Sequence, residues 1–71
     1  MLNFIETKYT AMLDLCKVIL VKVSFDRYLF HKELKKAIKW IKNPQELQQL
    51  KEWCLREYGN RYSSIIQGSF A

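Results

Sequence analysis

The stretch that decides the fold is Lys42-Asn43-Pro44-Gln45-Glu46-Leu47, in the middle part of the 71-residue chain. Asparagine is favoured immediately before a helix, and proline is favoured at the first helical position. Proline also disfavours helical geometry at the residue before it, so a preceding helix must end close to this point. The stretch therefore predicts the end of one helix and the start of the next. Because the connection is so short, we expect the two helices to form an αα-hairpin.

Downstream of this joint, apolar residues recur at helical spacing. They are Leu47, Leu50, Cys54 and Tyr58, and they predict a helix over residues 44–58. Gly59-Asn60 is typical of a C-terminal stop. Residues 60–71 show no periodicity, so we expect them to form an irregular C-terminal tail that is loosely packed or disordered.

Upstream of the joint, the pattern predicts a helix over about residues 26–42, capped by either Ser24 or Asp26. Its apolar side consists of Phe30, Leu34, Ala37, Ile38 and Ile41. Its opposite side carries a row of lysines, Lys32, Lys35, Lys36, Lys39 and Lys42. At 100° per residue these two sets lie on opposite faces, which indicates an amphipathic helix with one basic side.

The first part of the chain predicts a long helix over about residues 3–23, with Asn3 and Glu6 arranged as a capping box. An apolar seam follows it at alternating steps of four and three residues: Ile5, Tyr9, Met12, Cys16, Ile19 and Val23. The β-branched run Val18–Val23 would favour a strand in isolation. We predict helix because the seam passes through this run without a break in phase.

These elements together predict an all-α fold, a small three-helix bundle formed by a single helical domain over residues 1–59. A domain of this size is marginally stable, since its core is small. The N-terminus lacks the basic region of a secretion signal, and no apolar run is long enough to span a bilayer. We therefore expect a complete small cytoplasmic protein.

No residue pattern predicts catalysis. The one histidine, His31, lies among lysines, the carboxylates are scattered along the helices, and no glycine-rich loop is present. Cys16 and Cys54 fall on apolar faces, where free cysteines behave as small hydrophobic residues. The sequence predicts that the protein is not an enzyme and has no metal, cofactor or small-molecule substrate.

The first helix has more apolar residues than one neighbour needs. Beside its seam runs a second row, which we take as the candidate interface: Phe4, Ala11, Leu15 and Val18. Three further apolar residues, Tyr28, Trp40 and Leu55, fall outside the faces expected to be buried. Surplus apolar surface on a small protein often marks an interface. Our leading hypothesis is a protein–protein interaction module that forms a homodimer or binds a protein partner; the alternative is a monomer that buries the whole arc.

The net charge of +5 supports a second hypothesis. The five lysines of the second helix form the basic stripe expected of a protein that binds nucleic acid without sequence specificity, and Tyr28 on the same face could stack on a base. A plain solvated face would have the same composition. A basic amphipathic helix also allows a role at a membrane surface.

Overall fold

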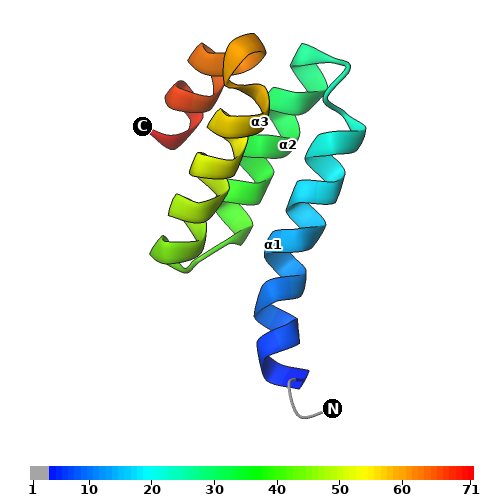
Figure 1. The fold of residues 1–71 in the computed structure, drawn as a ribbon, viewed down its shortest axis with the longest axis vertical. Coiled ribbons are helices and arrows are strands. Elements are labelled where there is room, and N and C mark those ends of the chain that lie inside the picture. The colour runs from blue at the N-terminus through cyan, green and yellow to red at the C-terminus, as the bar shows by residue number, and fades with distance from the viewer. Residues whose placement is uncertain (1–3) are drawn as a thin grey trace.

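The computed structural model describes the backbone of residues 4–71 and the side chains from residue 12 onward. It consists of three α-helices: α1 (Phe4–Lys22), α2 (Arg27–Trp40) and α3 (Pro44–Phe70). Figure 1 shows α2 and α3 side by side in opposite directions, with α1 alongside them. The predicted all-α three-helix bundle is confirmed. No helix in the described part of the chain is both long and apolar enough to cross a bilayer.

The β-branched run at the end of α1 is helical, as predicted. α1 continues to Lys22, and the amide of Val23 still donates to the carbonyl of Ile19 at 3.1 Å. The chain then turns, and the hydroxyl of Ser24 donates back to the carbonyl of Val21 at 2.8 Å. The predicted capping box at Asn3 and Glu6 lies outside the residues whose side chains are described.

Asp26, rather than Ser24, caps α2. Its carboxylate accepts a hydrogen bond from the amide of Leu29 at 3.0 Å, which satisfies one of the free donors of the first turn. α2 ends at Trp40, before the predicted end at residue 42. Ile41 adopts an extended conformation, and its side chain is buried in the core. Lys42 therefore lies outside the helix.

The joint before α3 forms as the sequence predicts. The side-chain oxygen of Asn43 accepts hydrogen bonds from the amides of Gln45 at 2.7 Å and Glu46 at 3.3 Å. Pro44 occupies the first turn, where its missing amide hydrogen leaves no partner unsatisfied. This cap fixes both the start of α3 and the tight connection from α2.

The predicted irregular tail is wrong, because α3 does not stop at Gly59 but continues to Phe70. Its backbone leaves helical geometry at Tyr62, where φ is −126° and ψ is 31°. Beyond this kink the helix turns back along the bundle (Figure 1). Tyr62 and Ile66 are buried, so their spacing of four residues is a helical pattern that the kink directs into the core.

The kink is attached to the α1–α2 turn through one backbone carbonyl. The hydroxyl of Tyr62 donates to the carbonyl oxygen of Ser24 at 2.6 Å, and the guanidinium of Arg61 donates to the same oxygen at 3.1 Å. Arg61 also lies over the Tyr62 ring, 5.1 Å from its centroid. These contacts between residues far apart in the sequence join the α1–α2 turn to the kink of α3.

The core draws on all three helices. Its buried members are Leu13, Cys16, Leu20, Phe30, Leu34, Ala37, Ile41, Leu50, Cys54, Tyr62 and Ile66. The predicted faces of α2 and α3 are confirmed, with Ile38, Leu47 and Tyr58 partly buried at their edges. Leu55, which was expected to lie outside the core, also packs against it.

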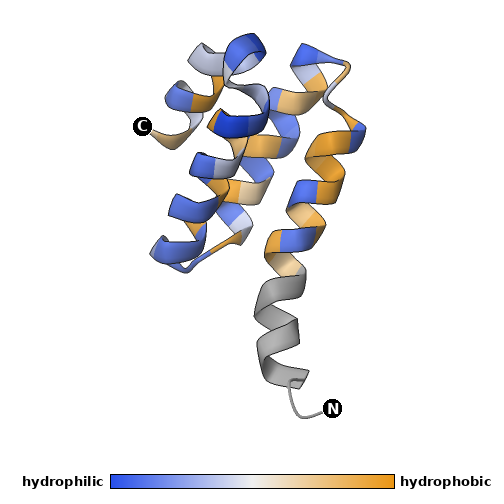
Figure 2. Ribbon diagram, viewed as in Figure 1, coloured by the Kyte–Doolittle hydropathy of each residue, from blue (hydrophilic) through white to orange (hydrophobic). Residues whose placement is uncertain are grey.

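The predicted seam of α1 is only partly correct. Of its described members Cys16 is buried, whereas Met12, Ile19 and Val23 are only partly buried. Leu13 and Leu20 are buried instead, so the helix is rotated about its axis relative to the prediction. Orange and blue segments alternate along the described part of α1 in Figure 2, and apolar residues lie on its outer side as well as on its inner side. The spacing of apolar residues therefore does not by itself determine this rotation.

Much of the aromatic content gathers around Phe30. Its ring lies 5.1 Å from Tyr58 in an edge-to-face arrangement and 4.7 Å from Tyr62, measured between centroids. Trp53 packs edge-on against Tyr58 at 5.7 Å. Such pairs contribute about 0.5–1.5 kcal/mol each beyond their buried area. This cluster packs α3 against α2 before the kink and at the kink itself.

We expect Leu34→Ala or Leu50→Ala to lower the free energy of unfolding by about 2–5 kcal/mol, because both side chains are fully buried and each truncation leaves a cavity. Urea unfolding followed by circular dichroism measures the change. Gln49→Ala, at an exposed position of α3, is the control and should change stability by less than about 0.5 kcal/mol. Unchanged unfolding curves for both leucine variants would contradict this core.

Tyr62→Phe should lower the free energy of unfolding by about 1 kcal/mol, because it removes the hydrogen bond to Ser24 and keeps the ring in place. Tyr58→Phe is the matched control, since the Tyr58 hydroxyl forms no hydrogen bond to any residue described in the structure. The same unfolding measurement applies. Equal stability of the two variants would mean that the Ser24 contact contributes nothing.

Candidate functional site

The outer side of α2 carries exposed lysines. Lys32, Lys35, Lys36 and Lys39 are all exposed, and at 100° per residue they span an arc of about 100° opposite the buried Phe30, Leu34 and Ala37. We call these four residues the lysine face. The prediction that Lys42 belongs to this side of the helix is wrong. Lys42 lies beyond the end of α2, in the segment that connects α2 to α3. Lys36 lies 3.5 Å from Glu33, a partly exposed ion pair.

Two exposed aromatic residues lie at the ends of this face. Tyr28, in the first turn of α2, is 73% exposed, and Trp40, at its last position, is 64% exposed. Neither belongs to the aromatic cluster around Phe30. Twelve residues separate them, which is about 18 Å along the helix axis. Tyr28 lies within the arc of the lysines, and Trp40 lies about 40° beyond its edge.

The outer side of α1 exposes three apolar side chains among charged ones. Leu15, Val18 and Val21 are 53%, 49% and 51% exposed. At 100° per residue their centre lies about 170° from that of the buried Leu13, Cys16 and Leu20, so they point away from the core. We call Leu15, Val18 and Val21 the α1 outer face.

Sequence reasoning named Leu15 and Val18 of this face but missed Val21. The three residues follow one another at steps of three, a signal that was present in the sequence. The other predicted interface residues, Phe4 and Ala11, lie outside the residues whose side chains are described.

A shallow groove lies on each side of α1. The groove toward α2 has a volume of about 250 Å³, and its apolar lining comes from Met12, Leu15, Ile19, Ala37 and Trp40. The groove toward α3 is lined by Lys17, Val18, Val21, Lys22 and Trp53, with the Lys17 ammonium 5.7 Å from the centroid of a Trp53 ring. The exposed apolar surface of α1 is therefore continuous with both of its neighbours.

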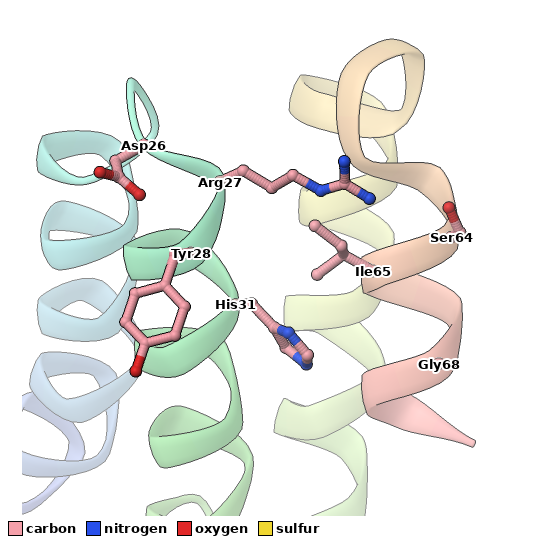
Figure 3. Close-up of a pocket in the computed structure, with 7 residues that line it drawn as sticks. All are labelled: Asp26, Arg27, Tyr28, His31, Ser64, Ile65 and Gly68. Carbon is pink, nitrogen blue, oxygen red and sulfur yellow. The ribbon is translucent and has the colours of Figure 1, made fainter.

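A wider hollow of about 790 Å³ lies between the start of α2 and the part of α3 beyond the kink. Figure 3 shows the side chains of Arg27 and His31 pointing toward α3, whereas Asp26 and Tyr28 point away from it. The carboxylate of Asp26 is already used to cap α2. The polar groups of this hollow therefore do not converge on one point in the way that a catalytic or ligand-binding constellation does.

Both cysteines are free and buried. Burial raises the pKa of the Cys16 thiol, and it raises the pKa of the Cys54 thiol to about 12 despite the opposing charge of Lys17. Protonated, buried thiols are poor nucleophiles and poor metal ligands. Among the residues that the structure describes, no group of three histidine, cysteine, aspartate or glutamate side chains is placed to hold a metal ion.

Comparison of the chain with known protein families, curated proteins and solved structures finds no match. Inference about its function therefore depends on the chemistry of its own surfaces, of which the α1 outer face and the lysine face are the most distinctive.

The raised pKa of Cys54 predicts a pH-dependent stability. Below the unfolded-state pKa of about 8.5 the thiol is protonated in both states. Above it, the unfolded chain loses the proton while the folded protein retains it up to about pH 12. Burial of the resulting thiolate is unfavourable, so the free energy of unfolding should fall as the pH rises through this window, by at most about 1.4 kcal/mol per pH unit.

Urea unfolding at about pH 8 and about pH 10 measures this effect. Cys54→Ala removes the titrating group, so its stability should fall less over the same interval than that of the unchanged protein. Comparing the two slopes cancels the contribution of the other titrating groups and of the small cavity. Identical slopes would contradict the assignment to Cys54.

Proposed function

We propose that the protein is a small interaction module that forms a homodimer through the α1 outer face. The observation that carries this proposal is the half-exposure of Leu15, Val18 and Val21 on the side of α1 opposite the core. No element of the described part of the chain buries these three side chains. The two buried free thiols fit a reducing cytoplasm as the place where the module acts.

Burial of this face would offset a weakness of the fold. A small domain has a correspondingly small core, and self-association is one of the common ways in which such domains gain stability. Each Å² of apolar surface removed from water contributes about 25 cal/mol.

The charges beside the face indicate a second copy of the chain as the partner. Asp14 precedes Val18 by one turn of helix, and Lys22 follows it by one turn; both are exposed. When two α1 helices pair in antiparallel fashion about Val18, each Asp14 lies opposite Lys22 of the partner subunit. The same symmetry places each Leu15 opposite Val21 of the partner subunit. The face is thus self-complementary in charge and in the order of its apolar residues, as a two-fold interface requires.

Parallel pairing has no such complementarity. It would place Asp14 beside its own copy and Lys22 beside its own copy, so that like charges lie across the interface. Like charges in this position are destabilising. We therefore propose the antiparallel arrangement.

Sedimentation equilibrium over a range of protein concentrations tests the dimer. Val18→Glu places two carboxylates against each other at the centre of the interface, so the dissociation constant should rise by at least about 100-fold. Gln49→Glu introduces the same charge at an exposed position of α3 and should leave association unchanged. A protein that stays monomeric up to millimolar concentration would contradict the proposal.

Charge reversal tests the orientation. Asp14→Lys alone and Lys22→Asp alone each turn two attractive pairs of the antiparallel dimer into repulsive ones, so each should weaken association by roughly 3- to 30-fold. The double variant restores both pairs with their signs exchanged and should recover most of the lost affinity. Failure of the double variant to recover affinity, with dimerisation itself intact, would exclude the antiparallel pairing.

A further inference from the structure

We propose that the lysine face of α2, together with Tyr28 and Trp40, binds single-stranded nucleic acid. Lysine ammonium groups would contact the phosphates, and the two aromatic rings would stack on bases. This site lies on a different helix from the α1 outer face, so the inference does not depend on the proposed dimer. RNA and single-stranded DNA share the chemistry that the site would recognise.

The charge of α2 supports a polyanionic ligand. Lys32, Lys35, Lys36 and Lys39 are exposed on one arc of the helix, and Glu33 is the only acidic residue between Arg27 and Trp40. Within the described part of the chain, Lys36 is the only one of the four with a carboxylate within salt-bridge distance, at 3.5 Å. Three positive charges therefore face solvent without a partner there. Ammonium groups grouped in this way bind phosphates with release of counterions.

The aromatic residues distinguish this face from a merely solvated one. Tyr28 and Trp40 are 73% and 64% exposed, although the core of the same protein contains an aromatic cluster. Leaving these rings in water gives up hydrophobic free energy that burial would have contributed. Aromatic rings beside a positively charged track are the arrangement on which single strands stack.

The geometry favours an unpaired strand over a duplex. The rings lie about 18 Å apart along the axis, and the lysines occupy the interval between them. A strand that runs along α2 would meet a ring at each end and phosphate contacts in the middle. Bases in a duplex are stacked on each other and cannot stack on these rings.

Fluorescence anisotropy with labelled oligouridylate and oligothymidylate tests the proposal on the full chain. Four phosphate contacts to a single strand predict that affinity falls roughly 50-fold between about 50 and about 200 mM salt. Lys35→Gln combined with Lys39→Gln leaves two contacts, so the fall should shrink to roughly 7-fold over the same interval. Lys51→Gln combined with Arg56→Gln removes the same charge from α3 and should leave the salt dependence unchanged.

The aromatic residues are tested separately from the charges. Trp40→Ala and Tyr28→Ala should each weaken binding by roughly 5- to 150-fold, the range found for loss of one stacked base. Neither should change the salt dependence, because no phosphate contact is lost. Both positions are exposed, so circular dichroism should show an intact fold.

Four results would overturn the proposal. They are the absence of oligonucleotide binding at about 50 mM salt, equal affinity for duplex DNA of the same length, a salt dependence unaffected by the lysine variant, and aromatic variants that bind as well as the unchanged protein. Vesicles of anionic phospholipid form a further arm of the experiment. Binding to vesicles without binding to oligonucleotides would assign the face to a membrane surface instead.

Discussion

The carbonyl oxygen of Ser24 positions the second part of α3 against the rest of the bundle. It accepts hydrogen bonds from the Tyr62 hydroxyl at 2.6 Å and from the Arg61 guanidinium at 3.1 Å, and so ties the α1–α2 turn to the kink of α3. Because the kink is held there, the helix beyond it turns back and delivers Ile66 to the core. The Tyr62 ring meanwhile packs on Phe30, which joins the same point to α2. One polar contact therefore sets the positions of segments from all three helices.

The three helices differ in how much of their apolar surface is buried in the core. α2 and α3 are joined by the short Asn43-Pro44 connection and by the aromatic cluster around Phe30. α1 has apolar residues on its buried side and on its outer side, so it contributes to the core and still exposes apolar side chains. The monomer uses one side of α1 and leaves the other exposed, which is why we place the interface there.

Apolar and basic surfaces are separated between helices. Leu15, Val18 and Val21 face outward on α1, whereas the lysine face is on α2, with Trp40 near the border between the two. An apolar surface associates by losing water, and a row of ammonium groups binds phosphates by releasing counterions. The two surfaces therefore suit ligands of different chemistry, and a single small bundle can present both at once.

The sequence by itself determined the helices and much of the two surfaces. The cap at Asn43 and the faces of α2 follow from local preferences and from a clear separation of apolar and charged residues, as do the exposed positions of Leu15, Val18 and the lysines. Local preference left Ser24 and Asp26 both open as the cap of α2, and the structure decides for Asp26. Only the tertiary structure decided the rotation of α1, because apolar residues lie on its outer side as well as on its buried side and their spacing alone does not select which of them face the core. The tertiary structure also decided the conformation of residues 60–70. Gly59-Asn60 is typical of a helix end, but burial of Tyr62 and Ile66 and the distant contact to Ser24 stabilise a kinked helix that local sequence does not reveal.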